Sequence, residues 1–186
     1  MSRIIAGAAG GLRLANVPGD KTRPTTDRVK EALFSRLESY GVLEGARVLD
    51  LFAGSGALGL EALSRGAASL DLVDNYPKAQ AVIERNLAAV SRSVTGSGRL
   101  LRSSVSAFLG AASQQWDLVF MDPPYPLTNP ELEELLGLLL PCLAEGAVLV
   151  LERSSRTPEP AWPAGLELFA SKKYGETQLY YLEPAA

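Results

Sequence analysis

The feature that most constrains the fold is a short apolar segment that runs directly into a glycine-rich loop. Residues 47–52 (RVLDLF) form this segment, and Gly54, Gly56 and Gly59 follow it in a GxGxxG pattern. A second apolar segment, 69–74, ends on Asp74, which lies 74 − 54 = 20 residues after the first glycine. This spacing is typical of a strand–loop–helix–strand unit whose backbone approaches a nucleoside ligand and whose acid binds ribose hydroxyls.

Strand-like and helix-like segments alternate along most of the chain. Besides the two strands above, we expect strands at 99–102, 116–121 and 147–152, and helices at 26–39, from the glycine loop to about 65, at 77–90 and at 131–140. The C-terminal segments 166–171 and 177–182 have the pattern of a hairpin. Repeated strand–helix units predict a mainly parallel α/β sheet, to which the hairpin adds antiparallel strands.

The composition excludes several kinds of catalytic site. The 186 residues contain no histidine, and Cys142 is the only cysteine. Ser-His-Asp and Cys-His catalysis, HExxH zinc sites and cysteine-rich zinc clusters are therefore excluded, and so is an intrachain disulfide. We expect no metal cofactor. There is no signal-like apolar run, and the most apolar stretch, 135–143, is too short to span a bilayer, so we expect a cytoplasmic protein without membrane contact.

Charge is distributed unevenly along the chain. Residues 1–30 hold six basic and two acidic residues (+4), whereas the remainder holds 12 basic and 19 acidic residues (−7). We divide the chain into an N-terminal hairpin–helix extension, 1–40, and a main domain, 41–186. The candidate RNA-binding residues of the extension are Arg3, Arg13, Lys21, Arg23, Thr25 and Arg28. The alternatives are scattered solvated charges and, for Arg23 and Thr25, closure over the cofactor or the target base.

Asp50 distinguishes between two kinds of nucleoside cofactor. It precedes the first glycine by four residues, where a carboxylate would repel a pyrophosphate and attract a cation. S-adenosylmethionine carries an α-ammonium and a sulfonium and has no phosphate. We therefore expect Asp50 near the amino-acid moiety of this cofactor and Asp74 on its ribose. The alternatives are a helix-capping or solvated loop acid for Asp50 and a surface acid for Asp74.

The strand at 116–121 runs into Asp122-Pro123-Pro124-Tyr125. The two prolines restrict the backbone, so the acid is held at the carboxyl end of a strand with an aromatic ring three residues away. Asp122 and the Pro123 carbonyl are suited to accept hydrogen bonds from an exocyclic base amine, and Tyr125 to stack on that base. Whether Asp122 also removes a proton stays open. The alternative is a strand-ending turn, which leaves the acid and the ring unexplained.

The chain resembles the RsmD-type ribosomal RNA methyltransferases over nearly its whole length. The segments that carry the resemblance are Arg3-Ile4-Ile5-Ala6-Gly7, Thr22-Arg23-Pro24-Thr25, 27–34, 50–59, 63–67, Asp122-Pro123-Pro124-Tyr125 and 173–177. The resemblance implies a Rossmann-like class I methyltransferase fold, with a mainly parallel seven-stranded sheet and helices on both faces. It also implies transfer of a methyl group from S-adenosylmethionine to N2 of guanine 966 in 16S ribosomal RNA.

The resemblance assigns candidate sites residue by residue. The catalytic set is Asp122, Pro123, Pro124 and Tyr125, and the cofactor set is Asp50, Phe52, Ala53, Gly54, Gly56, Asp74, Asn75, Ser104 and Val105. This chain has Ser103-Ser104 where the family usually has Gly-Asp, so a hydroxyl replaces the acid that meets the adenine amine. We expect a monomer that acts on 16S RNA within the small subunit or an assembly intermediate.

Three other functions remain possible from the sequence alone. A DNA or other RNA amino-methyltransferase shares the same chemistry. An NAD-dependent oxidoreductase explains the glycine pattern, but Asp50 is poorly placed for a pyrophosphate and the chain lacks a Tyr-x-x-x-Lys pair. A catalytically silent RNA-binding module leaves Asp-Pro-Pro-Tyr unexplained.

Overall fold

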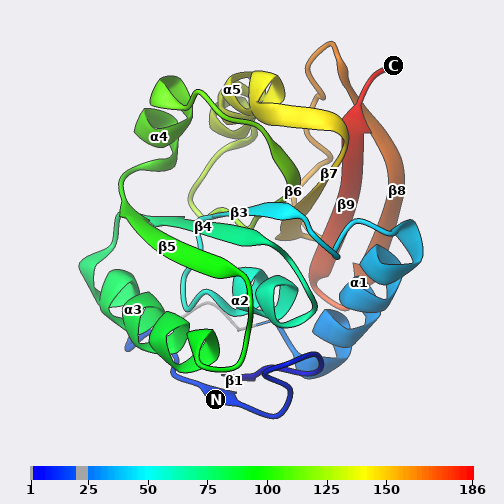
Figure 1. Ribbon diagram of the computed structural model, residues 1–186. Coiled ribbons are helices and arrows are strands. Elements are labelled where there is room, and N and C mark those ends of the chain that lie inside the picture. The colour runs from blue at the N-terminus through cyan, green and yellow to red at the C-terminus, as the bar shows by residue number, and fades with distance from the viewer. Residues whose placement is uncertain (1, 20–24) are drawn as a thin grey trace.

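A computed structural model describes residues 2–19 and 25–186, and its centre is a seven-stranded sheet (Figure 1). The strand order is β5-β4-β3-β6-β7-β9-β8. The strands are β3 (Arg47–Leu51), β4 (Ser69–Asp74), β5 (Ser97–Arg102), β6 (Trp116–Met121), β7 (Leu143–Ser154), β8 (Leu166–Tyr174) and β9 (Thr177–Pro184). Neighbouring strands among β3 to β7 pair in parallel, and β9 pairs antiparallel with both β7 and β8. The expected parallel sheet with a C-terminal hairpin is confirmed.

Helices cover both faces of the sheet, because the buried strands carry apolar side chains on both sides. In the view of Figure 1, α4 (Val105–Ala111) and α5 (Asn129–Leu139) lie above the sheet. Below it lie α1 (Asp27–Tyr40), α2 (Ala57–Ser64) and α3 (Pro77–Ser91). The side chains of each strand point to the two faces of the sheet in turn. Phe120 of β6 therefore belongs to the core below the sheet, and its neighbour Val119 to the core above it.

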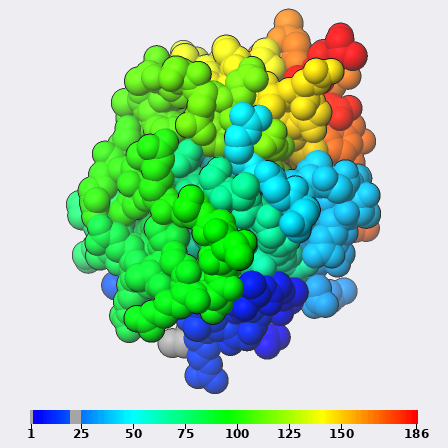
Figure 2. Space-filling view, viewed as in Figure 1, coloured from blue at the N-terminus to red at the C-terminus, as the bar shows by residue number. Residues whose placement is uncertain are grey.

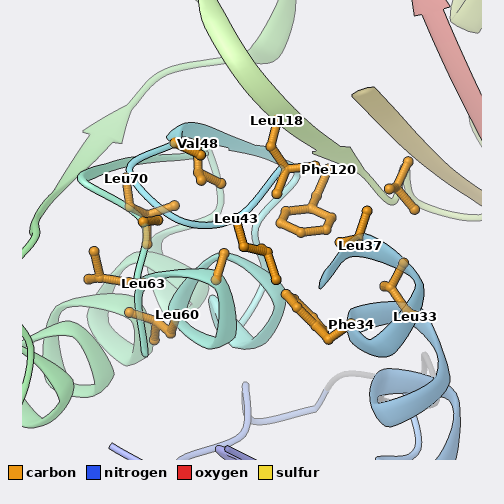
Figure 3. Close-up of a cluster of buried hydrophobic side chains, with 14 of the residues drawn as sticks. Leu33, Phe34, Leu37, Leu43, Val48, Leu60, Leu63, Leu70, Leu118 and Phe120 are labelled. Atoms are coloured by element: carbon orange, nitrogen blue, oxygen red, sulfur yellow. The ribbon is translucent and has the colours of Figure 1, made fainter. Parts of the chain in front are cut away.

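The lower core joins α1 and α2 to the centre of the sheet (Figure 3). Phe34 of α1 packs on Phe120 of β6 with their ring centroids 5.7 Å apart, and Leu60 and Leu63 of α2 belong to the same cluster, on the side of Leu70. These side chains are buried. The helix that follows the basic segment is therefore part of the main core.

The N-terminal residues form the expected small hairpin, β1 (Ser2–Arg3) with β2 (Arg13–Leu14). It lies against α2 and α3, and the space-filling view shows its dark blue atoms next to the green atoms of α3 (Figure 2). Ile4 and Leu14 are fully buried in the same cluster as Phe34. The hairpin is thus continuous with the main core, and the domain division at residue 40 stays a prediction.

Some elements differ from the sequence expectation. Helix α4 was not expected, because it is only 7 residues long and shows little amphipathic pattern. Strand β7 extends four residues earlier than expected, through Glu145 and Gly146, and β5 begins at Ser97. Polar and glycine residues end an apolar pattern without ending the backbone pairing. Among the described residues, no helix is both long enough and apolar enough to cross a membrane.

Gly7 fits tightly where the hairpin meets the end of α2. Its φ is +85°, and a Cβ built on it would lie 2.0 Å from the Ser64 carbonyl oxygen. Gly11 has a similar φ of +88° but has nothing within 4 Å of its Cβ position. Gly7→Ala is therefore expected to reduce the free energy of unfolding by clearly more than Gly11→Ala, for which backbone strain alone costs about 1–2 kcal/mol. Urea denaturation of the two variants measures the difference, and equal losses would contradict the close packing.

Candidate active site

The glycine loop joins β3 to α2 at the carboxyl edge of the sheet. The strand order reverses at this point, because β4 and β5 lie on one side of β3 and β6 and β7 lie on the other. Ligands of such sheets bind at this point. Phe52 has a φ of 57°, which is unusual for a residue other than glycine, and Gly54 and Gly56 follow with φ values of 62° and 82°. The loop is closed by hydrogen bonds from Ala53 N to Val73 O (3.1 Å) and from Gly56 N to Ala53 O (2.8 Å).

Asp74 holds the glycine loop against the end of β4. Its Oδ2 accepts a hydrogen bond from Gly54 N at 2.9 Å, and its Oδ1 accepts one from Tyr76 N at 2.9 Å. Gln80 donates to the Asp74 carbonyl at 2.9 Å. The carboxylate is therefore fixed in orientation while it remains partly exposed. This carboxylate can accept further hydrogen bonds from a diol on its open side.

A cavity of about 270 Å³ opens beside Asp74. Its lining residues are Phe52, Asp74, Asn75, Ser103, Ser104, Val105, Ser106, Leu127, Glu131, Glu134 and Leu135. Phe52, Val105, Leu127 and Leu135 provide apolar walls suited to a base ring, and a Cβ position on nearby Gly54 meets nothing within 4 Å. Three of the lining side chains are acidic and none is basic. The cavity therefore fits a nucleoside with cationic groups better than one with phosphates.

Asp50 is buried below the glycine loop, and its Oδ2 accepts a hydrogen bond from Gly59 N at 2.9 Å. Gly59 lies in the first turn of α2, so the structure gives Asp50 the helix-capping contact that the sequence left open. Burial raises the pKa of Asp50 to about 8, although the Gly59 hydrogen bond acts in the opposite direction. A contact between Asp50 and the ammonium of a cofactor stays a prediction.

Ser104 begins helix α4 on the opposite wall of the cavity. Its hydroxyl accepts a hydrogen bond from Ala107 N at 3.2 Å and caps the helix. The adjacent Val105 is buried and lines the same cavity. The Ser104 hydroxyl proton is still available to a ligand, while the predicted acceptor role toward an adenine amine competes with the cap.

Asp122-Pro123-Pro124-Tyr125 follows β6 directly, as expected. Asp122 is exposed at the strand end, Pro123 is buried, and the Tyr125 side chain is 75% exposed. A turn bond from Leu127 N to Pro124 O, 3.0 Å long, closes the segment. Leu127, two residues beyond Tyr125, also lines the cavity beside Asp74, so the motif leads directly into the wall of this cavity.

Arg153 of β7 contacts the loop that follows this segment, a role that the sequence did not predict. Its Nη2 donates to Leu127 O at 3.2 Å and to Asn129 Oδ1 at 2.7 Å. Burial lowers the pKa of Arg153, and the charge of nearby Asp122 acts in the opposite direction. A buried arginine thus joins the end of β7 to the loop after Tyr125.

The candidate RNA-binding residues have different environments. Arg3 pairs with Asp27 at 2.9 Å, and Arg28 is exposed. Arg13 and Arg85 of α3 both line a surface cavity of about 280 Å³. The Thr25 hydroxyl donates to Glu152 Oε2 at 3.4 Å, near the carboxyl end of β7. Lys21 and Arg23 lie outside the described residues.

Two further residues, Asn86 and Glu152, connect these parts, although they belong to none of the sequence motifs. Asn86 of α3 is buried and bonds both Ala15 N (2.8 Å) and Ser55 O (2.9 Å), so it links the N-terminal segment to the glycine loop. Glu152 is an acid near the carboxyl end of an apolar strand, as Asp50 and Asp74 are, and this signal could have found it. Within the described part of the chain, no group of three or more His, Cys, Asp or Glu residues is arranged to hold a metal ion.

The chain matches known proteins over nearly its full length. The family model described as "Conserved hypothetical protein 95" matches residues 2–183. "Ribosomal RNA small subunit methyltransferase D" of Escherichia coli K12 is 37% identical over 185 residues, which cover 97% of this chain and 90% of that protein. "Putative rRNA methyltransferase YlbH" of Bacillus subtilis is 36% identical, with 94% and 95% covered. The solved structure "Putative methyltransferase yhhF" from Escherichia coli superposes with a TM-score of 0.84, 36% identity and coverage of 98% and 97%.

Proposed function

Because the chain belongs to the conserved hypothetical protein 95 family of RsmD-type methyltransferases, we propose that it methylates small-subunit ribosomal RNA. The proposed reaction transfers a methyl group from S-adenosylmethionine to N2 of one guanine, guanine 966 in the numbering of 16S RNA. The products are N2-methylguanine, S-adenosylhomocysteine and a proton. The proposed substrate is the RNA within the small subunit or an assembly intermediate, and the proposed enzyme is a monomer.

The observation that carries this proposal is the acidic cavity at the carboxyl edge of the sheet. Asp74 and Ser104 line it, and so does Leu127, which lies two residues beyond Tyr125. The acidic lining favours a cationic cofactor, and it disfavours the pyrophosphate of NAD. The NAD-dependent oxidoreductase is therefore the weaker reading of the glycine pattern.

The proposed chemistry depends on positioning by this chain's own residues. S-adenosylmethionine, when bound, supplies an electrophilic methyl group on a sulfonium. Asp122 accepts a hydrogen bond from the exocyclic amine and holds its lone pair toward the methyl group, and the Pro123 carbonyl accepts a second one. Tyr125, which is exposed, stacks on the extruded base, a contact worth about 1–3 kcal/mol. Orientation of this kind supplies most of the rate enhancement without a metal or a histidine.

The decisive experiment supplies labelled S-adenosylmethionine together with four acceptors. These are unmethylated 30S subunits, naked 16S RNA, DNA and adenosine-containing RNA of unrelated sequence. We expect label on one guanine of the 30S subunit, identified by nuclease digestion and mass spectrometry. Label on DNA alone would support the DNA amino-methyltransferase, and no label on any acceptor, despite binding of RNA, would support the silent RNA-binding module.

Cofactor binding is expected to depend on pH through Asp50. Because the pKa of this buried carboxyl is about 8, Asp50 carries a proton at lower pH. A ligand whose ammonium group favours the ionised carboxylate must then displace that proton in order to bind. The affinity for S-adenosylhomocysteine should therefore rise between about pH 6.5 and 8, by at most about tenfold per pH unit. Asp50→Asn keeps an acceptor for Gly59 N and should lose this pH dependence.

Isothermal titration calorimetry of both proteins across this pH range measures the difference. The ligand's own amine titrates equally in both experiments, so it cancels in the comparison. Identical pH profiles for the wild type and Asp50→Asn would contradict the proposed role.

The same pKa shift of Asp50 also acts on folding. The folded state holds the proton more tightly than the unfolded chain, so this group's contribution to unfolding free energy falls as pH rises from about 4 to 8.

A further inference from the structure

Glu152 lies beside Asp122 at the carboxyl edge of the sheet. Strands β6 and β7 are parallel, and Met121 is in register with Leu151, so the next residues on the two strands are Asp122 and Glu152. Phe120 and Val150, two residues earlier, both face the lower core. Since side chains alternate along a strand, Glu152 faces the same side of the sheet as Val150, two residues earlier. This is the side of α1.

Glu152 is partly shielded from solvent, unlike an ordinary surface acid. Its Oε2 accepts a hydrogen bond from the Thr25 hydroxyl at 3.4 Å. Burial raises the pKa of Glu152, and the Thr25 hydrogen bond acts in the opposite direction. The neighbouring Arg153 is directed elsewhere, to Leu127 and Asn129. A carboxylate can accept several hydrogen bonds, so the contact with Thr25 leaves room, within the described part of the chain, for further donors.

Resting on the proposed function, we propose that Glu152 reads the N1–H of the target guanine. Guanine presents two adjacent donors on its Watson–Crick edge, N1–H and the N2 amine. Asp122 accepts from the amine, and Glu152, one strand further along the same edge, accepts from N1–H. Adenine has an acceptor at N1, so the same carboxylate rejects it. Glu152 is thus a specificity-determining residue of the target-base site.

The test compares two target bases that differ at this edge. Small-subunit RNA is assembled by ligation with either guanine or 2-aminopurine at the methylated position and is reconstituted with ribosomal proteins. 2-Aminopurine keeps the N2 amine but has an acceptor at N1. The measured quantity is the ratio of kcat/KM for guanine to kcat/KM for 2-aminopurine at pH 8. The intrinsic reactivities of the bases are the same for every variant, so they cancel when variants are compared.

We expect Glu152→Gln to lower this ratio by about 5–150-fold, since a lost discrimination of this kind is worth about 1–3 kcal/mol. The Gln side chain is able to donate to the N1 acceptor of 2-aminopurine, so activity on that base should rise relative to guanine. Glu152→Ala, the second variant, should also lower the ratio. Glu145→Gln, an exposed position on the same strand, is the matched control and should leave it unchanged.

Thr25→Val separates base reading from a purely structural contact. It removes the hydroxyl bonded to Glu152 and should lower activity on both bases equally. If Glu152→Gln and Glu152→Ala also lower both activities equally, then Glu152 only anchors Thr25, and the inference is overturned. If the wild type fails to methylate the guanine substrate, the proposed function fails, which is a different outcome.

Discussion

Replacing Asp122 by alanine is expected to lower kcat by about 10²–10³-fold, as the loss of one positioned transition-state contact does in other enzymes. The affinity for S-adenosylhomocysteine should stay unchanged, because Asp122 is absent from the lining of the cofactor cavity. Single-turnover methylation of 30S subunits gives the rate, and calorimetry gives the affinity. The two measurements together locate the effect at the target base.

Asp122→Asn is the informative companion variant. The amide oxygen still accepts a hydrogen bond from the base amine but is a far weaker base. A rate near that of the wild type would show that Asp122 acts as an acceptor only, and a rate near that of Asp122→Ala would show that it takes up a proton. If Asp122→Ala instead lost cofactor affinity while keeping normal turnover, the role assigned to Asp122 would be wrong.

The sheet was predictable because its strands carry their own signals. The apolar runs at 47–52, 69–74 and 116–121 are bounded by a glycine loop, an acid and a proline pair, and each strand appears where it was expected. The same local chemistry located the glycine loop and Asp74. What the sequence does not reveal is which acids are buried. Asp50 and Asp74 end similar strands, yet one lies under α2 and the other on the cavity.

Contacts between distant segments were the least predictable part of the site. Arg153 and Glu152 approach the Asp-Pro-Pro-Tyr segment and Thr25 only because β7 is placed next to β6. Their roles depend on sheet order, which local patterns do not specify. The N-terminal segment shows the same limitation: its charge suggested RNA binding, whereas its backbone amides at Ile5 and Ala6 prove to be bound by Glu61.

The second large effect is expected on stability, at a buried ion cluster between the N-terminal segment, α1 and α2. Glu61 and Lys30 have fully buried side chains with Oε1 and Nζ 3.6 Å apart. Glu61 also accepts hydrogen bonds from Ile5 N (2.8 Å), Ala6 N (3.1 Å) and Arg65 Nε (2.9 Å). Burial lowers the pKa of Lys30, and Glu61 acts in the opposite direction.

Glu61→Gln is expected to reduce the free energy of unfolding by about 3–5 kcal/mol, because it leaves a buried ammonium without its counter-charge. Glu38→Gln is the matched control, since Glu38 pairs with the same Arg65 at 2.9 Å but its side chain is 56% exposed. Because the Glu38 carboxylate is open to solvent, we expect this pair to contribute little, about 0.2–1 kcal/mol. Chemical denaturation of the two variants measures both values under the same conditions.

The expected difference rests on burial rather than on the number of ion pairs. If charge pairing alone stabilised the cluster, both variants would lose similar amounts, and that outcome would contradict the argument. Adding Lys30→Met to Glu61→Gln removes the unpaired ammonium and keeps an amide oxygen that can accept from the Ile5 or Ala6 amide, so the double variant should cost less than Glu61→Gln alone. Because Glu61 fixes the amides of Ile5 and Ala6, Glu61→Gln should also increase amide hydrogen exchange there, while Glu38→Gln should leave that exchange unchanged.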